Sequence, residues 1–413
     1  MFSVKELVES GRLTCVPVNY IFNNTESDLH CMLPQPETVP VIDFSLLTSH
    51  DPDQRSKTIA QLRYACLEWG FFMVINHGVS EMLRDEMIRE TESFFNLSGE
   101  DKREYAGTKL FDPIRCGTSF NPKVDKTLLW RDYLKIHVHP HFNAPTKPSG
   151  FSKVLRDYCQ KTREVAIELL KGISASLGLD PSYINEKMRV ESSKSHQLLV
   201  ANMYPPCPQP ELAMGLPPHS DHGFLTILMQ NGIDGLQVMH KGKWVSIKPL
   251  PNSFLVNTGD HMEILSNGKY KSVLHRAVVN NKAARLSIGT AHGPPLDTVV
   301  RPATELLADG VHPAYLGNRP DSPHLQRNCL VYEVARLVSD EYRLVQREMS
   351  CRVAELGARS TSLSLNECTE FLNLLNRFED CKERIPSLLV SRNMNVDSRD
   401  LVKESKACGD GKR

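Results

Sequence analysis

The chain has 413 residues, which is long enough for one large or two modest domains that each bury a core of their own. Its 49 basic and 49 acidic residues cancel, so no long-range field favours nucleic acid or an anionic membrane surface as a partner. No run reaches the roughly 18 consecutive apolar residues that span a bilayer, and charges interrupt the N-terminal stretch where a secretory signal is apolar.

We therefore expect a monomeric cytoplasmic protein, with the nucleus as a second location, that binds neither nucleic acid nor membrane. Its 11 cysteines are odd in number and widely spaced. In a chain of this size without a signal peptide, such cysteines predict free thiols rather than a framework of disulfides.

The first part of the chain mixes helical and strand patterns. Residues 1–36 begin with an amphipathic helical pattern and end in a polar stretch with two prolines. Residues 40–45 predict a first strand, and apolar residues at helical spacing from Ser56 onward predict a helix that stops at Gly70. The run Phe-Phe-Met-Val-Ile at 71–75 then predicts a buried strand.

More helices are predicted before the middle of the chain. Ser80 is a candidate N-cap for one helix, and residues 98–101 resemble a capping box for a short one. His77 lies in a turn after a strand, so we assign it a structural role. Residues 111–149 are polar and rich in Pro and Gly, so a surface loop that carries aromatic side chains is one alternative for them. Residues 150–178 predict a long helix.

From Gln197 the pattern changes to short apolar runs separated by turn residues, which is typical of an antiparallel sandwich or barrel. Two such sheets packed as a jelly roll would bring their strand faces together around one cavity. Residues 330–390 return to helical spacing, and residues 391–413 are polar enough to predict disorder. The predicted strands are 198–204, 236–239, 244–247, 254–257 and the two runs that contain His275 and Arg285.

The stretch 215–230 is the strongest candidate for chemistry. His219 and Asp221 stand two residues apart before an apolar, β-branched run, and on a strand such residues project to the same face. His275, on a distant β-branched run, could complete the site from a second strand. Two histidines and one carboxylate leave positions open on the metal, as in non-haem Fe(II) oxygenases. A structural zinc site would be closed by four ligands, usually with thiolates, and the chain has no Cys-x-x-Cys pair.

A third feature supports this interpretation, since an isolated His-x-Asp pair is common in a chain with 15 histidines. Arg285 and Ser287 also stand two apart on an apolar run, ten residues after His275. They would place a guanidinium fork beside a hydroxyl, an arrangement suited to gripping a carboxylate. The alternative for Arg285 is a surface ion pair.

In this order and spacing the three elements resemble the plant soluble 2-oxoglutarate- and Fe(II)-dependent dioxygenases, a flavanone 3-hydroxylase-like group with the isopenicillin N synthase-like fold. The resemblance covers roughly residues 38–315 and includes Glu-Trp-Gly-Phe-Phe at 68–72 and Asn-His-Gly-Val at 76–79. It implies an α+β, mainly β fold, in which a double-stranded β-helix (jelly roll) core carries a helical N-terminal domain and packing helices.

The resemblance also implies a division of the chain, although the sequence and length after residue 315 depart from the family, so that lid residues cannot be transferred. The expected parts are an N-terminal extension (1–37), an N-terminal dioxygenase domain (38–150), a long helix and connection (151–195), an Fe(II)/2-oxoglutarate jelly-roll catalytic domain (196–300), a divergent helical C-terminal region (301–390) and a disordered tail (391–413).

Two sets of site residues follow from the resemblance. Fe(II) would be the metal, 2-oxoglutarate the cosubstrate and ascorbate a candidate reductant. Tyr204 and Asn202 match the family's Asn-x-Tyr, although from the residues alone they could be a rim aromatic and a turn former. The implied iron ligands are His219, Asp221 and His275, and the implied cosubstrate contacts are Arg285, Ser287, Tyr204 and Asn202.

The resemblance says less about the substrate. Flavonoid-oxidising relatives place an aromatic and an acidic residue shortly after the Arg-x-Ser pair and a lysine two residues before the asparagine, where this chain has Ala291, Gly293 and Val200. Phe120 and Tyr133 lie in the segment that lines the family's substrate pocket. We expect hydroxylation or desaturation of a small, mostly apolar specialised metabolite, flavonoid-like or other, with O2 consumed and succinate and CO2 released.

Two functions of other classes remain alternatives. A cupin-type metal-dependent enzyme that does not use 2-oxoglutarate could share the ligands, but it would not require Arg285 and Ser287. A catalytically silent small-molecule-binding protein on the same fold would ordinarily lose a ligand, and none is lost in this sequence.

Overall fold

The computed structural model describes residues 3–22 except Arg12, 38–119 except Thr108 and Leu110, 127–307, and 313–315. The described residues all belong to a unit that spans Met1–Pro320. Phe120, the second part of the predicted N-terminal extension, nearly all of the predicted helical C-terminal region and the predicted tail lie outside them. In the described part of the chain, no helix is both long and apolar enough to cross a membrane.

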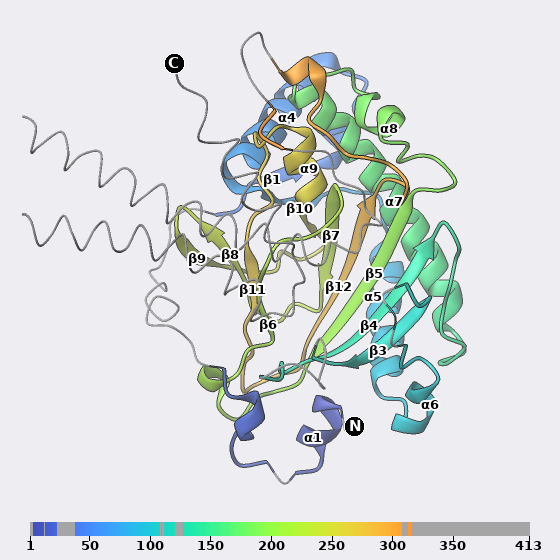
Figure 1. The fold of residues 1–413 in the computed structure, drawn as a ribbon, viewed down its shortest axis with the longest axis vertical. Coiled ribbons are helices and arrows are strands. Elements are labelled where there is room, and N and C mark those ends of the chain that lie inside the picture. The colour runs from blue at the N-terminus through green and yellow to red at the C-terminus, as the bar shows by residue number, and fades with distance from the viewer. Residues whose placement is uncertain are drawn as a thin grey trace, which may run out of the picture. The chain divides into compact units, whose positions relative to one another are not determined.

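Two β-sheets form the core of the protein (Figure 1). The larger sheet has the strand order β1-β2-β10-β7-β12-β5-β4-β3 and the smaller one β6-β11-β8-β9, and neighbouring strands are antiparallel except β1 and β2. The strands are β1 (Val41–Asp43), β2 (Phe71–Ile75), β3 (Ile114–Thr118), β4 (Asp132–His139), β5 (His196–Tyr204), β6 (Leu216–His219), β7 (Leu225–Gln230), β8 (Leu236–His240), β9 (Lys243–Ile247), β10 (Phe254–Thr258), β11 (His275–Ala277) and β12 (Arg285–Gly293).

Apolar side chains hold the two sheets together. Phe71 and Leu255 of the larger sheet share one buried cluster with Val238 and Ile247 of the smaller sheet. Side chains alternate between the two faces of a strand, so the neighbouring residues of the larger sheet face the other way. The two packed sheets form the predicted jelly roll, which confirms the expected mainly β fold.

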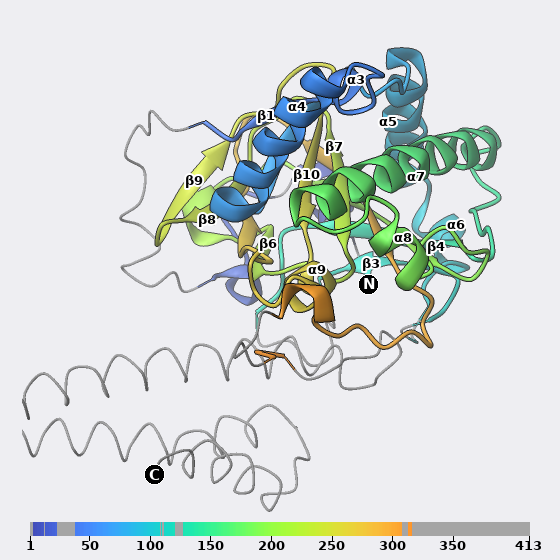
Figure 2. The same ribbon diagram turned by 90° about the horizontal axis from the view of Figure 1, so that it is seen from above.

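Helices cover the outer face of the larger sheet, with α4 and α7 lying side by side across it (Figure 2). On α7, Leu155, Leu169 and Ile173 are fully buried in the cluster that also contains Leu199 and Ile227 of the sheet. The helices are α1 (Val4–Glu9), α3 (Phe44–Leu47), α4 (Pro52–Tyr64), α5 (Glu81–Phe95), α6 (Gly99–Arg103), α7 (Phe151–Ser176), α8 (Tyr183–Lys187) and α9 (Asp260–Leu265), with a π-helical turn at Ala65–Trp69 and 3-10 turns at Val18–Tyr20, Pro210–Leu212 and Thr304–Leu306.

Local signals account for several helix ends. The Ser80 hydroxyl accepts from the backbone N–H of Leu83, as expected for the N-cap of α5. The predicted stop at Gly70 is also present, with φ +61°. A Cβ at Gly70 would lie 2.6 Å from Cγ2 of Val273 and 2.7 Å from the carbonyl oxygen of Lys271, so this turn requires glycine.

The segment 111–149 is more regular than the surface loop that was one alternative for it. It contributes β3 and β4, which extend the larger sheet beyond β5. The run Asp132–His139 alternates strictly between buried and half-buried residues. Leu134, Ile136 and Val138 join the core cluster beneath α7, so Tyr133, Lys135 and His137 face the interior of the jelly roll.

The N-terminal segment docks on this sheet through a buried carboxylate. Asp132 is 4% exposed, and its two carboxylate oxygens accept from the backbone N–H groups of Val4 and Lys5, each at 2.9 Å. Val4 is fully buried in a cluster with Tyr20 and Trp130. The first turn of α1 is therefore attached to the strand that carries Tyr133 and Lys135.

We expect Asp132→Ala to destabilise the protein and to release residues 3–22. The substitution leaves two helix N–H groups without their acceptors, which typically costs about 1–3 kcal/mol per buried group. Urea unfolding and limited proteolysis of the N-terminal segment measure the two effects. Asp157→Ala, at an exposed position of α7, is the matched control, and equal stability of the two variants would contradict the docking role of Asp132.

Candidate metal centre

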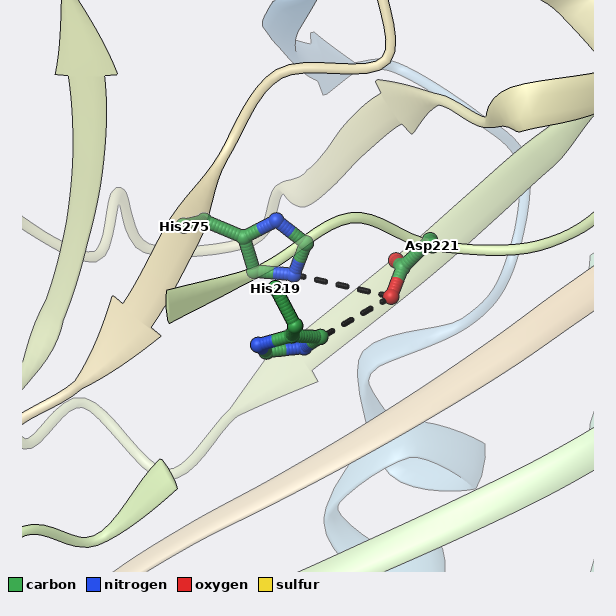
Figure 3. Close-up of side chains that lie close together, drawn as sticks. All are labelled: His219, Asp221 and His275. Atoms are coloured by element: carbon green, nitrogen blue, oxygen red, sulfur yellow. Dashed lines mark ion pairs between the residues drawn. The ribbon is translucent and has the colours of Figure 1, made fainter. Parts of the chain in front are cut away.

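His219, Asp221 and His275 come together inside the jelly roll (Figure 3). His219 ends β6 and His275 begins β11, and the two residues are direct partners in the antiparallel pair. Oδ1 of Asp221 lies 3.7 Å from Nε2 of His219 and 3.6 Å from Nε2 of His275. The three candidate ligand atoms all lie within 4.8 Å of one another, which is close enough for one ion to contact all three.

Asp221 reaches this position from a loop. Strand β6 ends at His219, so Asp221 is not on this strand. The prediction that His219 and Asp221 project from one face of a strand is therefore wrong. The Asp221 carbonyl oxygen accepts from the backbone N–H of Asp260 at 2.8 Å. The Asn257 side chain donates to Oδ2 of the carboxylate at 2.9 Å, which leaves Oδ1 directed at the histidines.

Backbone carbonyls orient both imidazole rings. Nδ1 of His219 lies 2.9 Å from the Pro217 carbonyl oxygen, and Nδ1 of His275 lies 3.1 Å from that of Val273. A carbonyl only accepts, so each Nδ1 must donate its proton, which leaves Nε2 as the ring atom available to a metal. Partners of this kind also fix the ring orientation of histidines that bind metals.

The electrostatics of the group suit a cation. Burial lowers the pKa of His219 to about 3, so this imidazole is neutral at physiological pH. Burial raises the pKa of the Asp221 carboxyl, but the neighbouring His275 outweighs it, and the pKa lies below its ordinary value. Burial lowers the pKa of His275, but the interactions that favour the protonated ring, chiefly the negative charge of Asp221, together outweigh burial, so the pKa is raised. A metal ion would take the place of the proton that this imidazole binds.

The donor set fits Fe(II). Two imidazole nitrogens and one carboxylate converge on one space, and among the described residues no fourth His, Cys, Asp or Glu joins the group. A metal held by these three side chains keeps coordination positions open for other ligands, as non-haem iron chemistry requires.

A second polar site lies at the start of β12. Arg285 is 2% exposed, and its Nη2 donates to Oε1 of Gln230 at 2.7 Å. Its guanidinium carbon lies 5.1 Å from the centre of the Tyr204 ring. Nε and Nη1 are buried and, in the described part of the chain, form no hydrogen bond. Unsatisfied buried donors are costly, so this guanidinium fits an anionic ligand such as a carboxylate, which accepts charge-assisted hydrogen bonds.

The neighbouring strand β5 completes this region. In register, Tyr204 is the partner of Arg285, and Asn202 is the partner of Ser287. Ser287 and Asn202 are both buried, and Oδ1 of Asn202 accepts from Nη1 of Arg131 at 2.9 Å. Asn202 therefore lies within a strand rather than in a turn.

The predicted substrate residues that the structure describes share the inner face of the sheet. Tyr133 pairs with Asn202, and Val200 lies two residues before Asn202 on β5. Ala291 and Gly293 follow Ser287 at even spacing on β12, so their Cα positions face the same side. Phe120 lies outside the described residues.

Sequence reasoning missed the residues that hold the candidate site together. Asn257 fixes the carboxylate of Asp221, and Gln230 binds Arg285. Asn257 and Gln230 each interrupt or end an apolar run, and a polar residue at such a position was the one available signal.

Comparison with known proteins identifies two matching families. The 2OG-Fe(II) oxygenase superfamily matches residues 195–294, and the non-haem dioxygenase in morphine synthesis N-terminal family matches residues 39–156. The 2-oxoglutarate-dependent dioxygenase 19 of Oryza sativa subsp. japonica is 49% identical over 66% of this chain and 80% of its own length. Flavanone 3-dioxygenase 2 of the same organism is 36% identical over 70% of this chain and 80% of its own length.

A solved structure shows the same architecture. The crystal structure of JOX2 in complex with 2OG, Fe and JA superimposes with a TM-score of 0.69 at 32% identity. The match covers 79% of this chain and 93% of JOX2.

Proposed function

Because this chain belongs to the 2-oxoglutarate- and Fe(II)-dependent dioxygenases, we propose that it hydroxylates or desaturates a small, mostly apolar specialised metabolite and releases succinate and CO2. The enzyme uses Fe(II) and 2-oxoglutarate. The names of its relatives include a flavanone dioxygenase, and JOX2 holds JA beside 2OG and Fe. These names support a small-molecule substrate, flavonoid-like or other, rather than a macromolecule.

We assign each side chain a role in this reaction. His219, Asp221 and His275 hold the iron on one side, because their donor atoms converge and the opposite side carries no fourth ligand among the described residues. When bound, the iron and 2-oxoglutarate together activate O2 and supply the oxidising chemistry. Asn257 and the carbonyls behind the two histidines keep the ligand atoms in place.

The cosubstrate contacts form a separate part of the cavity. The Arg285 guanidinium, which has buried donors without partners, donates to the distal carboxylate of 2-oxoglutarate, while Gln230 accepts from its Nη2. Ser287, two residues further along β12, donates its hydroxyl to the same carboxylate, and Tyr204 adds a phenolic hydrogen bond. Asn202 lies on the path toward the iron and is held there by Arg131.

One observation carries this proposal: a buried arginine with two unpaired donors shares the jelly-roll interior with the triad. A cupin-type enzyme that works without 2-oxoglutarate has no need of this carboxylate site. A silent binding protein has no need of a complete set of metal ligands. The two alternatives therefore each leave one of the two sites unexplained.

Succinate release tests the reaction class directly. We expect the purified protein with added Fe(II) to convert 2-oxoglutarate to succinate, and a metabolite extract to accelerate this conversion. Mass spectrometry of the extract should show a product that has gained one oxygen atom or lost two hydrogens. Metal-dependent conversion of an extract component without any consumption of 2-oxoglutarate would favour the cupin-type alternative.

We also propose that the protein is a monomer in the cytoplasm or nucleus and that ascorbate is its reductant. The domain division from the sequence is part of the same proposal. The jelly-roll catalytic domain of this division, residues 196–300, contains all three candidate iron ligands together with Arg285 and Ser287.

A further inference from the structure

Lys135 lies on the inner face of the larger sheet, in a different row of cross-strand partners from the cosubstrate contacts. It is the register partner of Val200 on β5 and of Arg115 on β3. The level next to it contains Tyr133 and Asn202, and Asn202 is the partner of Ser287. Lys135 therefore lies about one step of the strand pleat, roughly 7 Å along the strands, from the row that holds the cosubstrate contacts.

Lys135 is also separated from β12 across the sheet. Strand β5 lies between β4 and β12, and adjacent strands are about 4.8 Å apart. The backbone of Lys135 is thus about 10 Å from that of β12. A ligand group bound to Lys135 is therefore distinct from a carboxylate bound to Arg285.

Lys135 and Arg115 form a cationic pair without a carboxylate. In the described part of the chain neither side chain has an ion pair, and Nε of Arg115 is buried without a hydrogen bond. Nζ of Lys135 lies 5.5 Å from the centre of the Tyr133 ring, which is also 5.5 Å from the guanidinium carbon of Arg131. Two cations, Lys135 and Arg131, thus lie beside one aromatic ring, and Arg115 is the register partner of Lys135.

The electrostatic cost of this arrangement is visible at Lys135. Burial, followed by the charges of Arg131 and Arg115, lowers the pKa of its ammonium group to about 7. Like charges in a half-buried site are unfavourable unless an anion joins them. At the level of Lys135, Val200 on β5 has an apolar side chain and its partner Gly289 on β12 has none, so the space beside Lys135 suits an apolar body.

We propose that the substrate of this enzyme carries a carboxylate that binds to Lys135 and Arg115, with its apolar body over Tyr133 and Val200. This inference rests on the proposed function, because it places the anion in the substrate cavity of a dioxygenase. It also revises the expectation that the substrate next to Val200 is mostly apolar, because it adds an anionic group to that substrate. The lysine that flavonoid-oxidising relatives carry at the position of Val200 is absent, but Lys135 restores a cation at the same level from the adjacent strand.

Binding of matched acids and amides tests this assignment. Benzoate, phenylacetate, cinnamate and 2-naphthoate, each with its primary amide, are titrated calorimetrically into the Fe(II)- and 2-oxoglutarate-loaded protein under nitrogen. We expect at least one acid to bind about tenfold or more tightly than its amide. Lys135→Met should abolish this preference, and Lys135→Arg should retain most of it. Lys153→Met, at an exposed position of α7, is the matched control and should behave as the wild type.

Three results would overturn the proposal. These are the absence of any acid preference in the wild type, a preference that survives Lys135→Met, and a loss in Lys135→Met of affinity for 2-oxoglutarate instead of for the acid. Succinate release is measured separately on the same preparations. A wild type that releases succinate but lacks an acid preference refutes the anion site alone, whereas one that releases none refutes the proposed function.

Discussion

Alanine at His219, Asp221 or His275 should abolish iron-dependent turnover while the protein remains folded. Each substitution removes one of three donors from a site that has no fourth donor among the described residues. Loss of a residue that merely supports a ligand typically costs 10- to 100-fold in metal affinity or activity, so loss of a ligand should cost at least about a hundredfold. Iron content after gel filtration and succinate release measure the effect, and circular dichroism checks the fold.

His222→Ala provides a sharp control for these variants. His222 follows Asp221 directly and pairs with Asp260 at 3.3 Å, yet it does not belong to the converging group. Its replacement should leave the iron content unchanged. A triad variant with full iron content and full activity would remove that residue from the proposed site.

Much of this site could be predicted because its residues carry local signals. His-x-Asp before an apolar run, a histidine on a later run and Arg-x-Ser on the next are readable without a structure. The jelly roll follows from the same runs, since strands such as β8 and β9 are separated by clear turn residues. What local signals cannot supply is the pairing of distant residues, such as Asn257 with Asp221 or Gln230 with Arg285.

Strand β4 and helix α9 are among the elements that escaped prediction, and each did so for a physical reason. The strand β4 alternates apolar and polar residues over Asp132–His139, but its flanks are rich in Pro and polar residues that favour a loop. Lys135 was missed together with this strand. Helix α9 (Asp260–Leu265) is a short segment of mixed polar and apolar residues among strands, and so short a segment does not show a period that distinguishes a strand from a helix.

Arg285→Ala should raise the apparent KM for 2-oxoglutarate more than about tenfold. The guanidinium is 2% exposed and offers two unpaired nitrogens, whereas Ser287 alone is a neutral donor. Removing one partner of a buried, hydrogen-bonded charge pair typically costs about 2 to 5 kcal/mol, largely because the other charge stays unpaired. At about 1.4 kcal/mol per decade, this corresponds to more than tenfold. Succinate release at varied 2-oxoglutarate measures the constant.

Two further variants separate this role from a general effect of burying an arginine. Arg285→Lys should recover only part of the loss, because a point charge cannot reproduce the planar fork. Arg84→Ala removes another buried arginine, which binds Asn252 at 2.6 Å on the far side of the sheet; it should lower stability without changing the constant for 2-oxoglutarate. Iron binding should be unchanged in Arg285→Ala, because Arg285 is not one of the converging donors. If its 2-oxoglutarate dependence were also unchanged, the carboxylate pocket would lie elsewhere, and the cupin-type alternative would gain support.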